Sequence, residues 1–195
     1  MLSGSPVAVV RARAELEDRG VRCTPLHVTH AFHSGLVQPA ADAVIAHFEK
    51  EGLPVEPLTI PMTSNVSGRW MANHSGGAAY WAEHIVSTVR FTENVAAVLD
   101  WQPTVILEVG PGRTLCSLVG KCLEGVEPAA RPLVAQTMRH PKDNSLADSE
   151  VFLGMLGRLW TAGVDVDWNA FHTGERQLKV RSQLEIVKVF VFTLC

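Results

Sequence analysis

An apolar stretch that stops at glycine and proline is the strongest constraint on the fold of this chain. Thr104-Val-Ile-Leu-Glu-Val109 is a short apolar run, and Gly110-Pro-Gly112 ends it. A helical pattern follows from Leu115 to Cys122, and Pro132-Leu-Val-Ala-Gln136 is a second apolar run. Short runs of this kind between turn signals are typical of buried parallel strands. The order strand, helix, strand therefore predicts an α/β fold with a mainly parallel sheet.

The rest of the chain adds helices and two further strands. Helices are expected over Pro6–Arg19, where Ser5 is the N-cap, and over Val37–Phe48, whose apolar residues follow a helical spacing. Loose alternation predicts strands over Val21–Val28 and Leu58–Met62. Further helices are expected around residues 80–87, 92–99 and 149–162. The apolar face of the last one is predicted to hold Phe152, Leu153, Leu156, Leu159 and Trp160.

Composition excludes several classes of protein. Hydrophobic residues make up 47% and charged residues 19%, so the chain can bury a core and is not a disordered tail. The net charge of −3 gives no basic footprint, so nucleic acid is not an expected partner. No apolar run is long enough to cross a bilayer, and the first residues do not resemble a signal peptide. Four scattered cysteines without a CxxC spacing favour reduced thiols and a cytoplasmic protein that does not bind membranes.

Three histidines, His27, His30 and His33, form the densest group of reactive side chains. Spacing alone leaves three interpretations open: a metal site, a general base at the end of a strand, and histidines without a chemical role. No carboxylate or cysteine accompanies them, which disfavours a metal. Gly110–Arg113 lacks the third glycine of a phosphate loop and is expected to be a tight turn. Ser75 lacks the setting of a nucleophile elbow.

Several motifs together resemble one family. His30-Ala-Phe-His-Ser34 resembles the HAFHS motif of acyltransferase domains in type I polyketide synthases. Thr63-Ser-Asn-Val-Ser-Gly68 is similar to the SNvTG segment of these domains, and Glu108-Val-Gly-Pro-Gly112 is similar to EvGPG. The stretch from Tyr80 to Phe91 is similar to YWxxN/HxxxxVRF, and the stretch from Gly157 to Trp168 resembles the linker that follows the domain. Each motif is weak alone, but together they are specific.

The resemblance implies a malonyl-CoA:acyl carrier protein acyltransferase that works through an acyl-serine ester. By resemblance His33 is the general base, and His84 orients it through a backbone carbonyl. His30, Phe32 and Asn65 are implied to bind substrate, and HAFH is typical of malonyl selectivity. No metal or bound cofactor is implied. Malonyl-CoA is the substrate, and the acceptor is the phosphopantetheine thiol of the carrier protein. A ketosynthase domain is the implied neighbour.

The chain departs from the family in one respect. It contains no Gly-His-Ser-x-Gly elbow, and the family's carboxylate-binding arginine is also missing. We therefore expect a fragment that is inactive alone, or alternatively a non-catalytic docking fragment of a synthase. The expected parts are a ferredoxin-like small-subdomain remnant (1–32), part of an α/β-hydrolase-like large subdomain (33–138), a linker (139–175) and a tail outside the family (176–195). The apolar end of that tail either adds an edge strand or is not native coding sequence.

Overall fold

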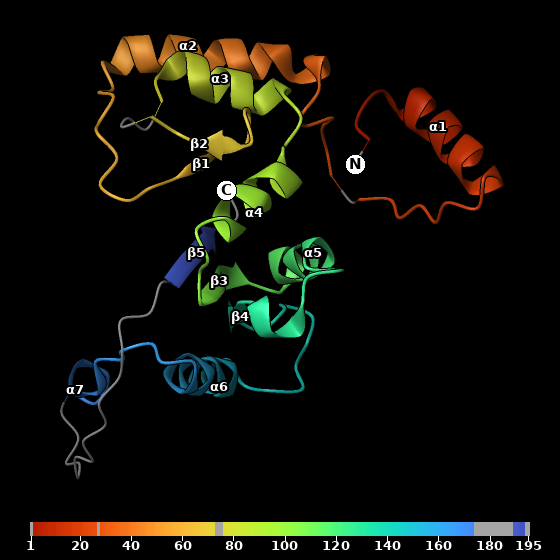
Figure 1. Ribbon diagram of the computed structural model, residues 1–195. Helices are drawn as coiled ribbons and strands as arrows, with labels where there is room; N and C mark the ends of the chain where they lie inside the picture. The colour runs from red at the N-terminus through yellow and green to blue at the C-terminus, as the bar shows by residue number, and fades with distance from the viewer. Residues whose placement is uncertain (1, 27, 73–75, 174–188, 194–195) are drawn as a thin grey trace. The chain divides into compact units, whose positions relative to one another are not determined.

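The computed structural model describes residues 2–26, 28–72, 76–173 and 189–193. The chain divides into two compact units, residues 1–97 and 98–195, and each unit is described by itself. Helices alternate with short strands along the chain (Figure 1). The division falls inside helix α4 (Phe91–Leu99).

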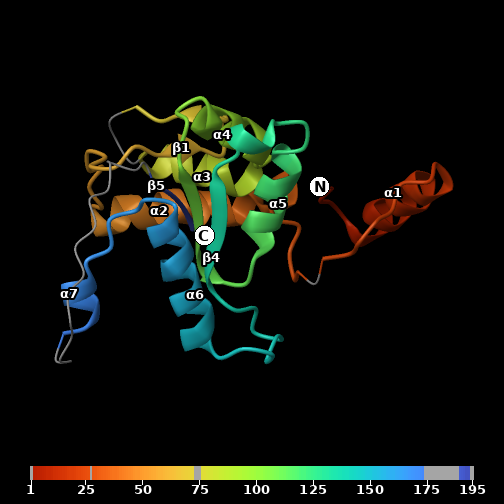
Figure 2. The ribbon, with the colours of Figure 1, turned by 60° about the horizontal axis from the view of Figure 1, so that its bottom comes forward.

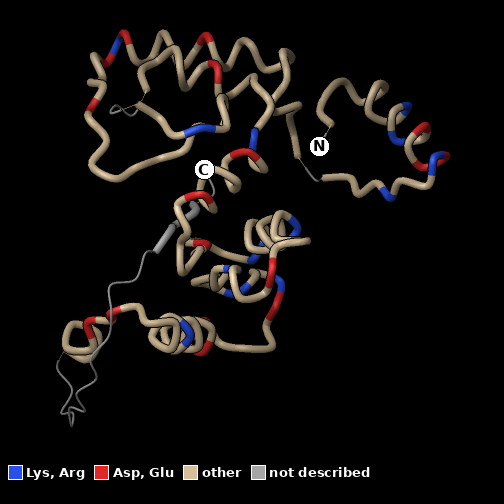
Figure 3. The backbone as a smooth tube through the Cα atoms, viewed as in Figure 1, with Lys and Arg blue, Asp and Glu red and all other residues tan. Residues whose placement is uncertain are grey.

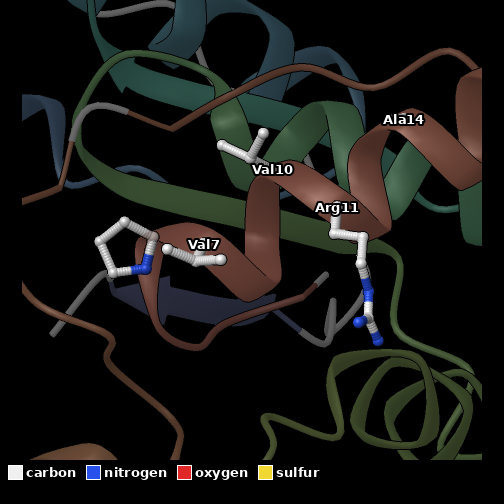
Figure 4. Close-up of a pocket in the computed structure, with 5 residues that line it drawn as sticks. Val7, Val10, Arg11 and Ala14 are labelled. Atoms are coloured by element: carbon white, nitrogen blue, oxygen red, sulfur yellow. The ribbon is translucent and has the colours of Figure 1, made fainter.

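The first unit begins with helix α1 (Pro6–Asp18), as the sequence predicts. The Ser5 side chain accepts a hydrogen bond from the backbone N–H of Ala8 and so caps the helix. No residue of α1 is buried. An open pocket lies on this helix, lined by Pro6, Val7, Val10, Arg11 and Ala14 (Figure 4). Its lining is almost wholly aliphatic, so it is not the candidate site.

The strand expected over Val21–Val28 is wrong. The described residues of this segment form no strand, and Leu26 and Val28 are exposed. A strand is stable only when its backbone groups pair with a neighbour, and alternating side chains do not supply that neighbour. The segment leads instead to the histidine loop and the short 3₁₀ helix η1 (Gly35–Val37).

Two helices, a small hairpin and the first part of α4 make up the rest of the first unit. Helix α2 (Gln38–Glu51) packs along α3 (Ala78–Val86), and the two lie side by side in Figure 1. The strand expected over Leu58–Met62 is wrong in position, because pairing starts at β1 (Thr63–Ser64), which is antiparallel to β2 (Arg69–Trp70). The turn between them ends at Gly68, whose φ is +67°. Because a hairpin turn sets the register of its two strands, the paired residues lie next to the turn and after the predicted range Leu58–Met62.

The second unit is built on a three-stranded parallel sheet. Strands β3 (Val105–Pro111), β4 (Leu133–Met138) and β5 (Val189–Thr193) lie in the order β4-β3-β5. Helix α5 (Thr114–Cys122) is followed by the short 3₁₀ helix η2 (Pro128–Ala130), and together they connect β3 to β4. The predicted parallel pairing of these two strands is confirmed. Figure 2 shows α5 and α6 (Asp148–Thr161) on either side of β4.

The core of the second unit corrects the predicted face of α6. Met155 and Leu159 of α6 are buried against Val105, Leu107 and Ala135. Leu156 is half-buried beside them, whereas Phe152, Leu153 and Trp160 are 40–49% exposed. The helix carries more apolar residues than one sheet face can cover, so the geometry of the sheet selects which of them are buried. The short helix α7 (Trp168–Phe171) follows.

Charged residues of both signs are interspersed along the described chain (Figure 3). Most charges of α1 lie in its C-terminal half, where Arg11 pairs with Glu15 and Arg13 with Glu17. Within the described ranges, no helix combines the length and the apolar character that a bilayer crossing requires.

Candidate active site

The loop that carries His33 has an unusual backbone. His33 has φ +60°, in the left-handed region that histidine enters more readily than most residues with a side chain. The next residue stabilises the turn, because the Ser34 hydroxyl donates to the Ala31 carbonyl at 2.7 Å and accepts from Leu36 N–H at 3.3 Å. The loop is therefore held in one conformation that points the half-buried His33 ring at helix α3.

The end of α3 supplies the hydrogen-bond partners of His33. The last carbonyls of a helix have no partner within it. His33 N–H donates to the carbonyl of Ile85 at 3.0 Å. Its ring nitrogen Nδ1 lies 3.0 Å from the carbonyl of Ser87 and 3.3 Å from that of His84. A carbonyl only accepts, so Nδ1 carries the proton and donates it. Nε2 is then an unprotonated base, and it makes no hydrogen bond to any described residue.

This arrangement suits a base that becomes positively charged. The C-terminal end of α3 carries partial negative charge, which stabilises a cation by about 0.3–1 kcal/mol at an exposed site. The predicted role of the His84 carbonyl has a geometric basis here, but the Ser87 carbonyl is nearer to His33 Nδ1. Sequence reasoning missed Ser87, because only the position of the helix end makes its carbonyl available.

The His84 side chain faces the same ring. The two imidazoles stand edge to face, with centroids 5.8 Å apart and planes at 87°. Burial, together with the charge of His33, lowers the pKa of His84 below its ordinary value of 6.5. His84 Nε2 lies 3.0 Å from the side-chain nitrogen of Asn65. The His84 ring is thus part of the site as well as its backbone.

Asn65 sits in the β1–β2 turn and is held on two sides. Its side-chain oxygen accepts a hydrogen bond of 2.6 Å from the amide of Asn94, and its carbonyl accepts from Arg90 N–H at 2.9 Å. The assignment of Asn65 to substrate binding stays a prediction. Asn94 is only 2% exposed, and sequence reasoning missed it. The available signal was a polar residue next to Val95 in an apolar helix.

The other two residues expected to bind substrate lie together on the same loop. The rings of His30 and Phe32 are 5.9 Å apart, and Phe32 is 50% exposed. His30 Nδ1 lies 2.9 Å from the Thr29 hydroxyl. His27 and Ser75 fall outside the described residues. Among those that are described, no three His, Cys, Asp or Glu side chains gather as a metal site requires.

The prediction that Gly110–Arg113 forms a tight turn holds only for its end, because Gly110 and Pro111 belong to β3 and the chain bends at Gly112 and Arg113 before α5. Gly110 and Gly112 have φ of +144° and +100°, and α5 starts two residues later. The turn is held by Glu108, which is 2% exposed. Its carboxylate oxygens accept from Leu115 N–H at 3.2 Å and Cys116 N–H at 2.8 Å. Sequence reasoning missed this role, although a carboxylate inside an apolar strand was the signal.

Comparison with known proteins places the chain in one family. Residues 1–166 match the family described as the acyl transferase domain. A component of the phenolphthiocerol/phthiocerol polyketide synthase of Mycobacterium tuberculosis is 32% identical over 165 residues, which is 84% of this chain and 11% of that protein. A spectinabilin polyketide synthase protein of Streptomyces orinoci is 29% identical over 185 residues, covering 92% of this chain and 8% of its own length.

Solved structures agree with these relatives. The acyltransferase domain of the second module of the salinomycin polyketide synthase has a TM-score of 0.76 and 31% identity, covering 88% of this chain and 38% of that domain. The SpnD acyltransferase domain, solved with 2-(pent-4-yn-1-yl)malonyl, has a TM-score of 0.73 and 35% identity, covering 82% of this chain and 38% of its own. The chain thus spans a small part of these synthases and under two fifths of the solved domains. By its motifs, its mixed α/β fold and the match over residues 1–166, this chain belongs to the acyl transferase domain family, and its relatives here are polyketide synthases.

Proposed function

We propose that the first unit supplies the general base of a malonyl-CoA:acyl carrier protein acyltransferase site. The observation that carries this proposal is the bonding of His33, whose Nδ1 proton is donated to backbone carbonyls while Nε2 has no hydrogen-bond partner among the described residues. The nucleophilic serine lies on a segment outside these 195 residues, because the sequence contains no Gly-His-Ser-x-Gly. The chain alone is then inactive. The acyl carrier protein, the acyl-CoA and a neighbouring ketosynthase are its partners.

The proposed reaction moves one proton back and forth. His33 Nε2 accepts the serine proton as the serine oxygen attacks the thioester carbonyl of malonyl-CoA. The carbon–sulfur bond breaks, the imidazolium returns the proton to the coenzyme A thiolate, and malonyl-serine remains. The carrier thiol then gives its proton to His33 and attacks the ester. The serine oxygen leaves with that proton, and malonyl stays on the carrier as a thioester.

The expected parts of the domain are kept as proposals. Residues 1–32 are a remnant of the ferredoxin-like small subdomain, and 33–138 belong to the α/β-hydrolase-like large subdomain. Residues 139–175 form the linker, and 176–195 are a tail outside the family. The family match supports one acyltransferase domain over residues 1–166, and it extends past residue 138 into the proposed linker.

A complementation assay tests the function. The chain is mixed with a separately expressed segment of a related acyltransferase domain that carries the serine elbow, and malonyl transfer to carrier protein is followed by intact mass. We expect His33→Ala to slow transfer by about 10²–10⁴-fold, the usual contribution of a general base. His47→Ala is the matched control, because His47 is exposed on α2 and lies outside the site.

Two results would contradict the proposal. A stable adduct of about 86 Da on the chain alone, the mass of a malonyl group, would place the nucleophile within these residues. Malonyl transfer at the wild-type rate in the His33→Ala variant would show that His33 is not the general base. A chain that binds the elbow segment without restoring transfer would favour the non-catalytic docking fragment.

We also propose that His30 and Phe32 favour malonyl over methylmalonyl units. The Phe32 ring is half exposed and lies against His30, so it is available to fill the space beside the substrate α-carbon. Excluding one methyl group discriminates by about 1–3 kcal/mol, or roughly 10–200-fold. In the complemented assay, His30→Tyr with Phe32→Ser is expected to raise the methylmalonyl share. An unchanged ratio would place selectivity in the other segment.

A further inference from the structure

Three side chains from three elements form a hydrogen-bonded row that ends on His84. Asn94 on α4 donates from Nδ2 to Asn65 Oδ1 at 2.6 Å. Asn65, in the β1–β2 turn, has its own Nδ2 3.0 Å from His84 Nε2. We call these three residues the amide relay. Asn94 is almost fully buried, so the relay starts from a fixed point inside the unit.

The direction of the relay follows from its buried end. Asn94 Oδ1 is buried and has no hydrogen-bond partner among the described residues. The Asn65 side-chain oxygen accepts from Asn94, so its nitrogen is the atom that faces His84. An amide nitrogen donates and does not accept. Asn65 therefore donates toward His84.

The consequence for His84 is a defined protonation state. Nε2 accepts a hydrogen bond only when it is unprotonated, so the ring is neutral and its proton is on Nδ1. His33 has the same tautomer, because its Nδ1 donates to carbonyls. The two rings differ at Nε2, which Asn65 occupies in His84 and no described residue occupies in His33.

We propose that Asn94 and Asn65 are positioning residues, which hold His84 neutral so that His33 is the histidine of the pair that takes up a proton. This inference rests on the proposed role of His33 as the base. With ring centroids 5.8 Å apart, a charged His84 would repel the imidazolium of His33. The relay prevents that competition without placing a charge of its own beside the base.

The other groups around His84 do not take over the role of Asn65 in setting its protonation state. The ring centroids of Tyr80 and Trp81 on α3 lie 6.2 and 5.9 Å from the ring centroid of His84, and Trp81 is uncharged. Glu83 is the exposed residue beside it on α3. On α4, Arg90 and Glu93 pair with each other at 3.2 Å and are half exposed. Burial and His33 are the causes that lower the pKa of His84.

Nitrogen NMR on the whole chain tests the relay without any acyl transfer. Long-range ¹⁵N–¹H spectra assign the proton of each imidazole, with His33→Gln and His84→Gln identifying the signals. In wild type we expect His84 to hold its proton on Nδ1 at neutral pH, and its pKa to lie below the ordinary histidine value because the ring is buried beside His33. This measurement needs no relay variant to fold.

Two variants alter the amide relay, and a third variant is their matched control. Asn65→Asp places an acceptor at Nε2, so we expect His84 to gain a proton there and its titration midpoint to rise by at least about one pH unit. Asn94→Ala is expected to give a mixture of His84 tautomers. Asn169→Asp adds the same charge at an exposed position of the other unit and is expected to change neither histidine.

A wild-type His84 with its proton on Nε2, or an Asn65→Asp spectrum identical to wild type, would overturn the relay. Neither result bears on the proposed function, which the complementation assay tests independently. Conversely, the expected spectra with transfer unchanged by His33→Ala would reject the proposed function and keep the relay as a description of this histidine pair.

Discussion

At the scale of the residue, the site depends on backbone carbonyls. A non-glycine residue at φ +60° costs about 1–3 kcal/mol, and His33 keeps that conformation because three carbonyls at the end of α3 accept from its N–H and its ring. Carbonyl dipoles stabilise an imidazolium less than a full carboxylate charge would. In the proposed reaction, a base held this way returns its proton readily to the coenzyme A thiolate.

The lowered pKa of His84 makes the stability of the fold depend on pH. When the pKa of a histidine is lower in the folded state, the unfolded state binds more protons, so stability rises with pH. We expect the urea midpoint to fall as the pH drops from about 7.5 to about 5.5, because that window crosses the unfolded pKa.

The control for this dependence is His84→Gln, which keeps a polar group of similar reach and cannot be protonated. Its urea midpoint is expected to fall less steeply over the same window. The same steepness in wild type and variant would mean that other groups cause the pH dependence.

Cys116 is predicted to be the least reactive of the described thiols. Burial, followed by the hydrogen bond to Glu108, raises its pKa to about 12. At pH 8 the thiolate fraction is then about 10⁻⁴, and the thiolate is the reactive form. We expect iodoacetamide to modify Cys23 well before Cys116, with peptide mass spectrometry giving the order. In urea the two are expected to react alike, whereas equal rates in the folded chain would contradict the raised pKa.

At the scale of the element, β3 and α5 are tied together because a residue of the strand caps the helix. Arg113 precedes α5 and gives no side-chain cap. Glu108, at the middle of β3, takes that place, because both of its carboxylate oxygens accept from N–H groups in the first turn of the helix. Its negative charge also complements the positive end of the helix dipole. The Gly-Pro-Gly turn serves to bring the helix start back to this carboxylate.

Replacing Glu108 by Gln tests that cap. Glutamine offers one acceptor oxygen where two are used, so one N–H loses its partner and a buried NH₂ gains none. We expect the free energy of unfolding to fall by about 1–3 kcal/mol, measured by urea titration. Glu124→Gln, at an exposed position after α5, is the matched control and is expected to stay near wild type. Equal losses in both variants would show that charge, and not capping, is the cause.

The elements also show what the sequence could and could not predict. β3, β4 and most helices were predictable because local pattern and punctuation agree there. The strand at 21–28 failed because pairing is not a local property, and the face of α6 failed because the sheet selects it. His33, His84 and Asn65 meet as a group. Ser87 acts through the end of a helix, and Asn94 and Glu108 act through contacts with other elements, all of which single-sequence patterns place poorly.

At the scale of the whole molecule, the proposed base and the proposed relay belong to the first unit and the parallel sheet to the second. The sheet has a feature that local patterns could not settle. Its third strand comes from the end of the chain, and Val105–Val109 pairs with Val189–Thr193. The apolar tail therefore acts as an edge strand in this structure, one of the two interpretations that the sequence left open.

Truncating the chain after residue 175 tests whether that strand matters. Without β5, the backbone groups on one side of β3 lose their partners, and an unpaired edge on a strand as apolar as this one promotes association. We expect a lower thermal midpoint and earlier light scattering on heating. The matched variant keeps the full length and replaces Phe190 and Val191 by proline, because one of two successive residues directs its N–H toward β3 and proline has none. If β5 stabilises the sheet, the double proline variant behaves like the truncated chain. If both variants melt like wild type, the tail adds nothing to the sheet and β4 with β3 suffices for the second unit.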